Sequence, residues 1–142
     1  MTRRSGLFIV ILGGAVAGCS GTISAPKTTP VKGSVLYRGK PAAGVRVTFH
    51  PQFRSGAVQF TPSGLTDKDG VFTLSTAAAG DGAPVGEYVV TFDLPQVESD
   101  RANSGIEVEV DAWKGKYSDP AASTWKVRVE KGDNELAPFR LD

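Results

Sequence analysis

The sequence predicts an all-β domain of about seven short strands packed as a two-sheet sandwich. The 142-residue chain contains 17 glycines and nine prolines, so turns are frequent. No long segment repeats apolar residues with the spacing of a helix. Several short runs instead alternate apolar and polar residues with the period of a strand. Short strands of this kind bury their apolar faces between two sheets.

The stretch 65–74, near the middle of the chain, predicts a β-hairpin. Asp67 and Gly70 have the spacing of the first and fourth positions of a type I turn. The Asp67 carboxylate can accept hydrogen bonds from nearby backbone N–H groups, and Gly70 can take a positive φ at little steric cost. After the turn, Phe72 and Leu74 share one face of the expected second strand.

Six further segments have the strand pattern, and the clearest of them is 44–50. There Val45, Val47 and Phe49 alternate with polar residues, so these three side chains face the core. The other five strands are expected at 31–37, 86–92, 106–110, 124–130 and 136–141. Between the strands, loops are expected at 51–63, 76–84, 95–105 and 113–123.

The segments on either side of residue 105 are expected to differ in order. Residues 95–105 are polar and predict a mobile loop. In the strand expected at 106–110, Glu107 and Glu109 alternate with aliphatic residues and face outward. Charge on an exposed edge discourages pairing with other chains, so we expect this segment to be an edge strand.

The first 30 residues predict export and lipid attachment. Arg3 and Arg4 precede an apolar run at 7–17, which is shorter than the roughly 20 residues that span a bilayer and fits a signal peptide. At the end of this run, the residues Val16, Ala17, Gly18 and Cys19 resemble the bacterial lipobox. That resemblance implies a lipoprotein signal peptide at 1–18, cleavage before Cys19 and a diacylglycerol on its thiol. The alternative is a free cysteine beside an ordinary cleavage site.

The residues after the lipobox set the expected location. Ser20 follows Cys19 where an aspartate would be associated with retention in an inner membrane, so an outer-membrane destination is favoured. Residues 19–30 are small, polar and proline-bearing, which predicts a flexible lipidated tether. The domain itself is expected at 31–142.

Composition excludes several classes of protein. The formal net charge is +1, and without Arg3 and Arg4 the 16 basic residues fall to 14 against 15 acidic ones. A nearly neutral chain has no basic footprint for nucleic acid. Cys19 is the only cysteine, so no disulfide forms within the chain and the domain depends on its apolar core.

A succession of motifs resembles one family over nearly the whole domain. The motifs are Gly33-x-Val35, Gly39-x-Pro41-x-x-Gly44-Val45-x-Val47-x-Phe49, Thr66-Asp67-x-x-Gly70-x-Phe72 and Gly86-x-Tyr88-x-Val90. Together they resemble the carboxypeptidase regulatory-like domain of the transthyretin-like β-sandwich group. The tail from Lys116 to Leu141 is similar to small lipoproteins of planctomycete-type bacteria. The resemblance implies an immunoglobulin-like sandwich of about seven strands, and the family has no agreed activity.

No motif predicts catalysis, a metal site or a cofactor. Asp67, Asp69 and Gly70 form a fragment found in calcium loops, but the acidic residues that would complete six to eight oxygen ligands are missing downstream. His50 is the only histidine, and its outward position without a recognisable partner indicates a surface residue. The transthyretin-like hydrolases carry several active-site histidines and a C-terminal Tyr-Arg-Gly-Ser, which this chain lacks.

Trp113 and Tyr117 are the candidate ligand contacts. Both lie in the expected loop at 113–123, where aromatic rings can form a stacking platform for sugars. The alternative is that this loop folds its aromatic side chains over an open end of the sandwich. Trp125 alternates with Val127 and Val129 and is therefore expected in the core.

These observations predict a non-enzymatic, lipid-anchored β-sandwich on the periplasmic or outer surface of a bacterial envelope. Its expected role is structural or adhesive, with the membrane bound through the lipid on Cys19 and an envelope protein or polysaccharide as partner. The alternative is a glycan-binding or substrate-presenting accessory module at the cell surface. No nucleic-acid partner, cofactor or metal is expected.

Overall fold

The computed structural model describes residues 24–54, 56–102 and 104–142, and this part of the chain is all-β, as the sequence predicts. No helix that could cross a bilayer is found among these residues. The strands are β1 (Val31–Tyr37), β2 (Lys40–Pro41), β3 (Arg46–Pro51), β4 (Ser63–Leu65), β5 (Val71–Thr73), β6 (Gly86–Asp93), β7 (Pro95–Asp100), β8 (Ile106–Asp111), β9 (Lys126–Val129), β10 (Asn134–Glu135) and β11 (Phe139–Leu141).

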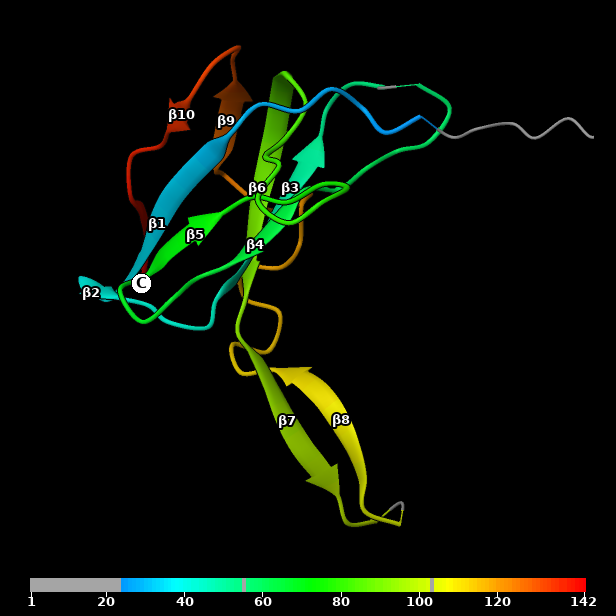
Figure 1. Cartoon of the computed structure of the whole chain (residues 1–142). Helices are drawn as coiled ribbons and strands as arrows, with labels where there is room; N and C mark the ends of the chain where they lie inside the picture. The colour runs from blue at the N-terminus through cyan, green and yellow to red at the C-terminus, as the bar shows by residue number, and fades with distance from the viewer. Residues whose placement is uncertain (1–23, 55, 103) are drawn as a thin grey trace, which may run out of the picture.

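The eleven strands form three sheets, which is a finer division than the seven strands expected from the sequence. In the first sheet β1 pairs with β10 and β11 in parallel and with β2 and β5 in antiparallel orientation. The second sheet is antiparallel, with the order β4-β3-β6-β9. The third consists of β7 and β8 alone and projects from the body of the domain (Figure 1).

The core lies between the first two sheets. Phe49 of β3 and Phe72 of β5 meet across the interface with ring centroids 6.5 Å apart, and Phe92 of β6 meets Phe139 of β11 at 5.2 Å. These rings come from the alternate positions that face inward in each strand. The other large side chains that are almost fully buried are Tyr88, Leu74, Leu141, Val31, Val35, Val45, Val47, Val90 and Val129.

The folded domain begins at Thr29, slightly before β1. Thr29 is buried and forms an isolated antiparallel bridge with Ala83. Its hydroxyl donates to the backbone carbonyl of Gly132 and lies 3.3 Å from the carbonyl oxygen of Glu130. Gly82 permits this approach, because a Cβ at that position would lie 1.8 Å from the Thr29 carbonyl oxygen. Thus Thr29 belongs to the folded domain, two residues ahead of the boundary expected at residue 31.

The turn at residues 67–70 forms as predicted, but the expected hairpin does not. The Asp67 carboxylate accepts hydrogen bonds from the amides of Asp69 and Val71, at 2.9 and 3.0 Å, and Gly70 has φ of 74°. However, β4 pairs with β3 and β5 pairs with β1, so the two strands beside the turn belong to different sheets. An isolated bridge joins Ser63 of β4 to Ser75, two residues after β5. The turn is therefore a corner between the sheets.

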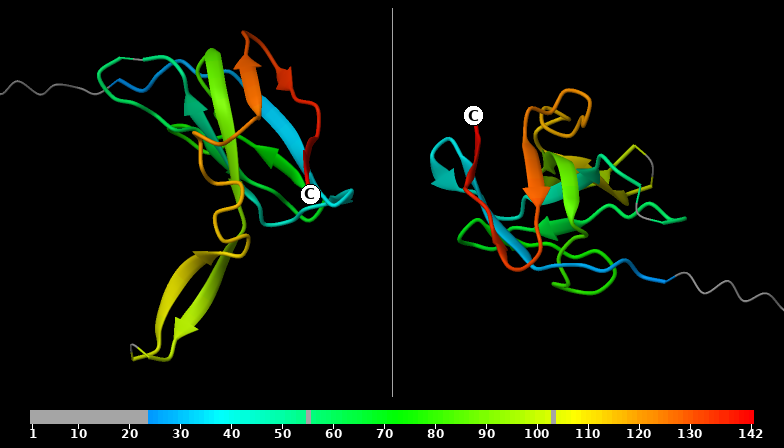
Figure 2. Two further views of the ribbon diagram at one scale, coloured as in Figure 1. Left: turned by 180° about the vertical axis from the view of Figure 1, so that it is seen from behind. Right: turned by 90° about the horizontal axis from the view of Figure 1, so that it is seen from above.

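The prediction of a loop at 95–105 is wrong for its first six residues. Residues 95–100 form β7, which pairs over its whole length with β8, from Pro95 with Asp111 to Asp100 with Ile106. The edge strand expected at 106–110 is present as β8. Seen from behind in Figure 2, this hairpin extends from one end of the domain, and the described N-terminal segment leaves from the other end.

Candidate functional site

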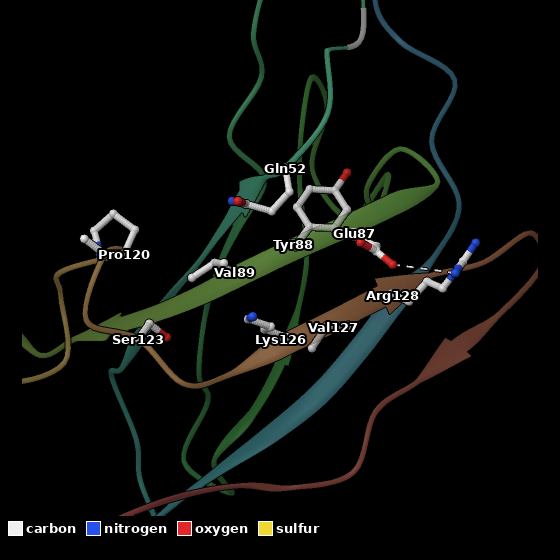
Figure 3. A pocket seen from close by; sticks show the side chains of 10 residues that line it. Gln52, Glu87, Tyr88, Val89, Pro120, Ser123, Lys126, Val127 and Arg128 are labelled. Carbon is white, nitrogen blue, oxygen red and sulfur yellow. Dashed lines mark ion pairs between the residues drawn. The ribbon is translucent and has the colours of Figure 1, made fainter.

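A shallow groove on the outer face of β6 and β9 is the first candidate site. Glu87 and Val89 of β6 lie beside Lys126 and Arg128 of β9, because Glu87 pairs with Arg128 and Val89 with Lys126 in the antiparallel register. Gln52 borders the groove on one side, and the loop at 120–123 borders it on the other (Figure 3). Alternation along both strands therefore places Glu87, Lys126 and Arg128 in the groove, together with apolar side chains such as Val89 and Pro120, while the opposite faces pack into the core.

The groove has hydrogen-bonding groups but no nucleophile held by a base. Arg128 and Glu87 form an exposed ion pair with an N–O distance of 3.6 Å, which contributes little to stability. Within the described residues, no carboxylate lies within ion-pair distance of Lys126. The Ser123 hydroxyl donates to the backbone carbonyl of Val90 at 2.5 Å. This set of groups can bind a polar or anionic ligand through charge-assisted hydrogen bonds.

His50 lies on the same outer face, on β3, and is partly buried. Its Nε2 atom is 2.8 Å from the hydroxyl oxygen of the buried Thr91, which faces the same way on β6. Burial lowers the pKa of the imidazole below its ordinary value of 6.5. The sequence pattern correctly indicated the outward direction of His50, but it did not reveal Thr91 as a partner.

The candidate ligand contacts Trp113 and Tyr117 lie in a cluster of rings at one end of the domain. Tyr117 is 8% exposed, its ring meets those of Trp113 and Trp125, and its hydroxyl donates to the backbone carbonyl of Asp142. Trp113 is only partly buried and also packs on Tyr37, with ring centroids 5.2 Å apart. The loop therefore covers the end of the core, and of these two rings Trp113 has the larger part that a ligand could reach.

In the described part of the chain, no group of three or more histidine, cysteine, aspartate or glutamate side chains could hold a metal ion. The Asp67 carboxylate instead closes its turn, and the hydrogen bonds from Val71 and then Asp69 lower its pKa. The predicted lipidation site, Cys19, lies outside the described residues.

The sequence analysis missed a second candidate site, the surface of the β7–β8 hairpin. Val97 is 67% exposed, Ile106 55% and Val108 40%. Ile106 and Val108 share one face of β8, whereas Val97 lies on the other face of the hairpin, opposite Glu109. The exposed pair on β8 marks a candidate interaction surface. The signal was present in the alternation at 106–110, but the preceding segment has one aliphatic residue, Val97, and so resembled a loop.

Asp111 fixes the base of the hairpin. Its Oδ1 atom accepts hydrogen bonds from the amides of Leu94 and Trp113, at 2.9 and 3.0 Å, and its Oδ2 atom accepts one from Gly115 at 2.8 Å. Partial burial alone would raise the pKa of this carboxyl, but the three amide hydrogen bonds and nearby Arg46 bring it below its ordinary value. One carboxylate thus joins the end of β6, the end of β8 and the turn that follows.

Arg46 makes a second connection between the hairpin and the body. From β3 its guanidinium reaches Asp93 at the end of β6, with an N–O distance of 2.8 Å, and Glu109 of β8 at 2.5 Å. The hydrogen bonds that Arg46 donates to Asp93, and then the one it donates to Glu109, raise the pKa of the guanidinium further. Together with Asp111, this contact holds the hairpin against the four-stranded sheet.

The comparisons with known proteins do not assign the chain. No family model matches it, and no curated protein sequence matches it. Among solved structures, it is similar to part of the crystal structure of a 9R-lipoxygenase from Cyanothece PCC8801, with a TM-score of 0.44 and 14% sequence identity. The match covers 81% of this chain and 16% of the lipoxygenase chain. This likeness carries no argument about function.

Replacing Asp111 with alanine is expected to loosen the base of the hairpin. Three backbone N–H groups lose their acceptor, which costs about 1–3 kcal/mol of unfolding free energy. Hydrogen exchange at Leu94, Trp113 and Gly115 should become faster. Asp119→Ala is the matched control, because the Asp119 carboxylate accepts one amide hydrogen bond, from Ala121 at 2.9 Å. Unchanged exchange in Asp111→Ala would contradict this role.

Stability is expected to fall as the pH drops below about 6.5, because folding favours uncharged His50. With a lowered pKa in the folded state, this contribution is complete above the ordinary value of 6.5 and is lost as the pH falls toward the lowered value. Urea unfolding at pH 7 and pH 5 measures the difference. His50→Gln should remove it, since the chain has no other histidine. An equal decrease in the variant would rule out His50 as the cause.

Proposed function

We propose that this protein is a non-enzymatic, lipid-anchored module of a bacterial cell envelope that holds a protein partner near the membrane. The anchor is the lipid on Cys19 after removal of residues 1–18, with the outer membrane favoured. Residues 19–28 form the tether. The body is an immunoglobulin-/transthyretin-like sandwich of the carboxypeptidase regulatory-like group.

The relative positions of the N-terminal segment and the hairpin carry this proposal. The described chain enters the domain at one end, and the β7–β8 hairpin extends from the other end (Figure 1). A tether of ten residues reaches at most about 35 Å when fully extended. Anchored in this way, the domain stays close to the lipid surface and directs its exposed aliphatic hairpin away from it.

The sandwich class is supported by the positions of the family-like motif residues. Val35, Val47, Phe49, Phe72 and Val90 are all buried between the two large sheets. Turn glycines of the same motifs have positive φ, including 78° at Gly39 and 74° at Gly44. These residues therefore support the folded core and its turns, so we assign partner binding to the exposed surface instead.

Cys19→Ala tests the anchor. In bacterial cells fed an alkyne-bearing fatty acid, the unchanged protein should incorporate the label and sediment with membranes. The variant should lose the label and move to the soluble fraction, because two or more acyl chains are needed for stable attachment. Ser20→Ala is the matched control, since it alters the neighbouring position and keeps the thiol. A Cys19→Ala protein that remains labelled would overturn the proposal.

The groove on β6 and β9, with its two basic side chains, favours a second function, the binding of an envelope polysaccharide. Lys126 and Arg128 project from β9 beside Glu87, with Gln52 on the far side of β6, as Figure 3 shows, and they can bond to hydroxyl or carboxylate groups of a sugar chain. On an array of cell-envelope polysaccharides, a ligand retained by the protein should bind at least about tenfold more weakly to Lys126→Ala/Arg128→Ala. Lys131→Ala, in an exposed turn, is the control. No retained polysaccharide would exclude this function.

A further inference from the structure

The outer edge of β8 has no partner strand within the described residues. β8 pairs with β7 on one side only, and the two strands form a sheet of their own. An edge of this kind presents unpaired backbone N–H and C=O groups, which can pair with an extended segment of another chain. β7 is less suited to such pairing, because it begins with Pro95, which has no N–H to donate.

The two faces of β8 differ in chemistry. Glu107 and Glu109 lie on one face, while Ile106 and Val108 lie on the other and remain exposed to solvent. The register places Glu98 of β7 opposite Val108. An added strand would therefore meet carboxylates on one face and aliphatic side chains next to a carboxylate on the other.

The charge of the hairpin determines which chain could fit. Residues 95–111 contain five acidic residues and one arginine, a formal charge of −4. A second copy of this chain would bring carboxylates onto the same face as Glu107 and Glu109, which is destabilising. A basic segment would place opposite charges there instead. The glutamates thus discourage self-association and leave the edge open to a cationic partner.

We propose that an extended segment of a partner protein, with alternating basic and aliphatic residues, adds to the outer edge of β8 as a third strand. Directly opposite residues in paired strands share a face. The partner's basic side chains then meet Glu107 and Glu109, and its aliphatic side chains cover Ile106 and Val108. This inference rests on the proposed function, because it specifies the site and the chemistry of the protein partner.

The hairpin is held at its base and leaves Glu107 open to a partner strand. A two-stranded hairpin is marginally stable alone, and a third strand with apolar contacts stabilises it. Asp111 and Arg46 attach the hairpin to the body, and Glu109 is partly neutralised by its contact with Arg46. Glu107 has no ion-pair partner within the described residues. Glu107 is therefore the carboxylate most available to an incoming cation.

Binding of a synthetic peptide tests the proposal. The probe is a fluorescent peptide of alternating lysine and valine, and its binding to the full chain in detergent is measured by anisotropy. The peptide should bind, and its affinity should fall as salt is added. When its carbonyls carry ¹³C, the bound peptide should show the infrared band of a β-strand. A peptide of alternating glutamate and valine, and a shuffled peptide of the same lysine and valine content, should bind much more weakly. Equal binding of the shuffled peptide would overturn strand addition.

Glu107→Lys tests the location. Reversal of this charge should weaken binding about fivefold or more, because an attraction becomes a repulsion. Glu130→Lys is the matched control. It makes the same charge change at an exposed position just after β9, outside the hairpin, and should leave binding unchanged. Equal loss in both variants would show that net charge alone attracts the peptide and would overturn the assignment to β8.

The result of the peptide-binding experiment can be distinguished from the result of the Cys19→Ala experiment. Peptide binding is measured in detergent and does not depend on attachment to a membrane. If Cys19→Ala keeps its fatty-acid label while the peptide still binds to β8, the anchor is wrong and the docking edge stands. If the label depends on Cys19 and the peptide does not bind, the docking edge is wrong and the anchor stands.

Discussion

A continuous series of aromatic contacts through the core is the interaction on which the rest of this structure depends. Ten of the twelve aromatic residues of the chain take part, with neighbouring ring centroids 5.2 to 6.5 Å apart. In order, they are Phe53, Tyr88, Phe49, Phe72, Phe139, Phe92, Trp125, Tyr117, Trp113 and Tyr37. Such pairs add about 0.5–1.5 kcal/mol each to the effect of burial. Without a disulfide in the described residues, this series joins both large sheets and the loop before β9.

The position of this series explains which surfaces remain for function. Because the rings face inward or cover an end of the core, the outer face of β6 and β9 carries the charged side chains of Glu87, Lys126 and Arg128 beside Val89. The β7–β8 hairpin contributes no ring to this series and has no core of its own. Its order comes from polar contacts at its base, chiefly those of Asp111 and Arg46. The proposed docking edge on β8 is thus separate from the aromatic side chains that stabilise the core.

Sequence reasoning succeeded where one side of a segment is buried. The strands at β1, β3 and β6 follow from alternation, and the Asp67 turn follows from local hydrogen-bonding chemistry. It failed at β7, because a strand exposed on both faces needs no apolar alternation. The corner at residues 67–70 was mistaken for a hairpin, since a local pattern does not reveal which sheet each strand joins. Likewise, the burial of Tyr117 and the approach of Thr91 to His50 depend on long-range packing.

The parallel pairing of β1 with β10 and β11 determines when the first sheet can form during synthesis of the chain. The first strand of the domain obtains two of its neighbours from the last twenty residues of the chain. Its sheet therefore cannot close until nearly all of the polypeptide has been released, and such distant pairing is intrinsically slow. For a chain that crosses a membrane unfolded, this delay is useful, because premature folding would obstruct translocation. Under the proposed export, this topology favours folding after translocation.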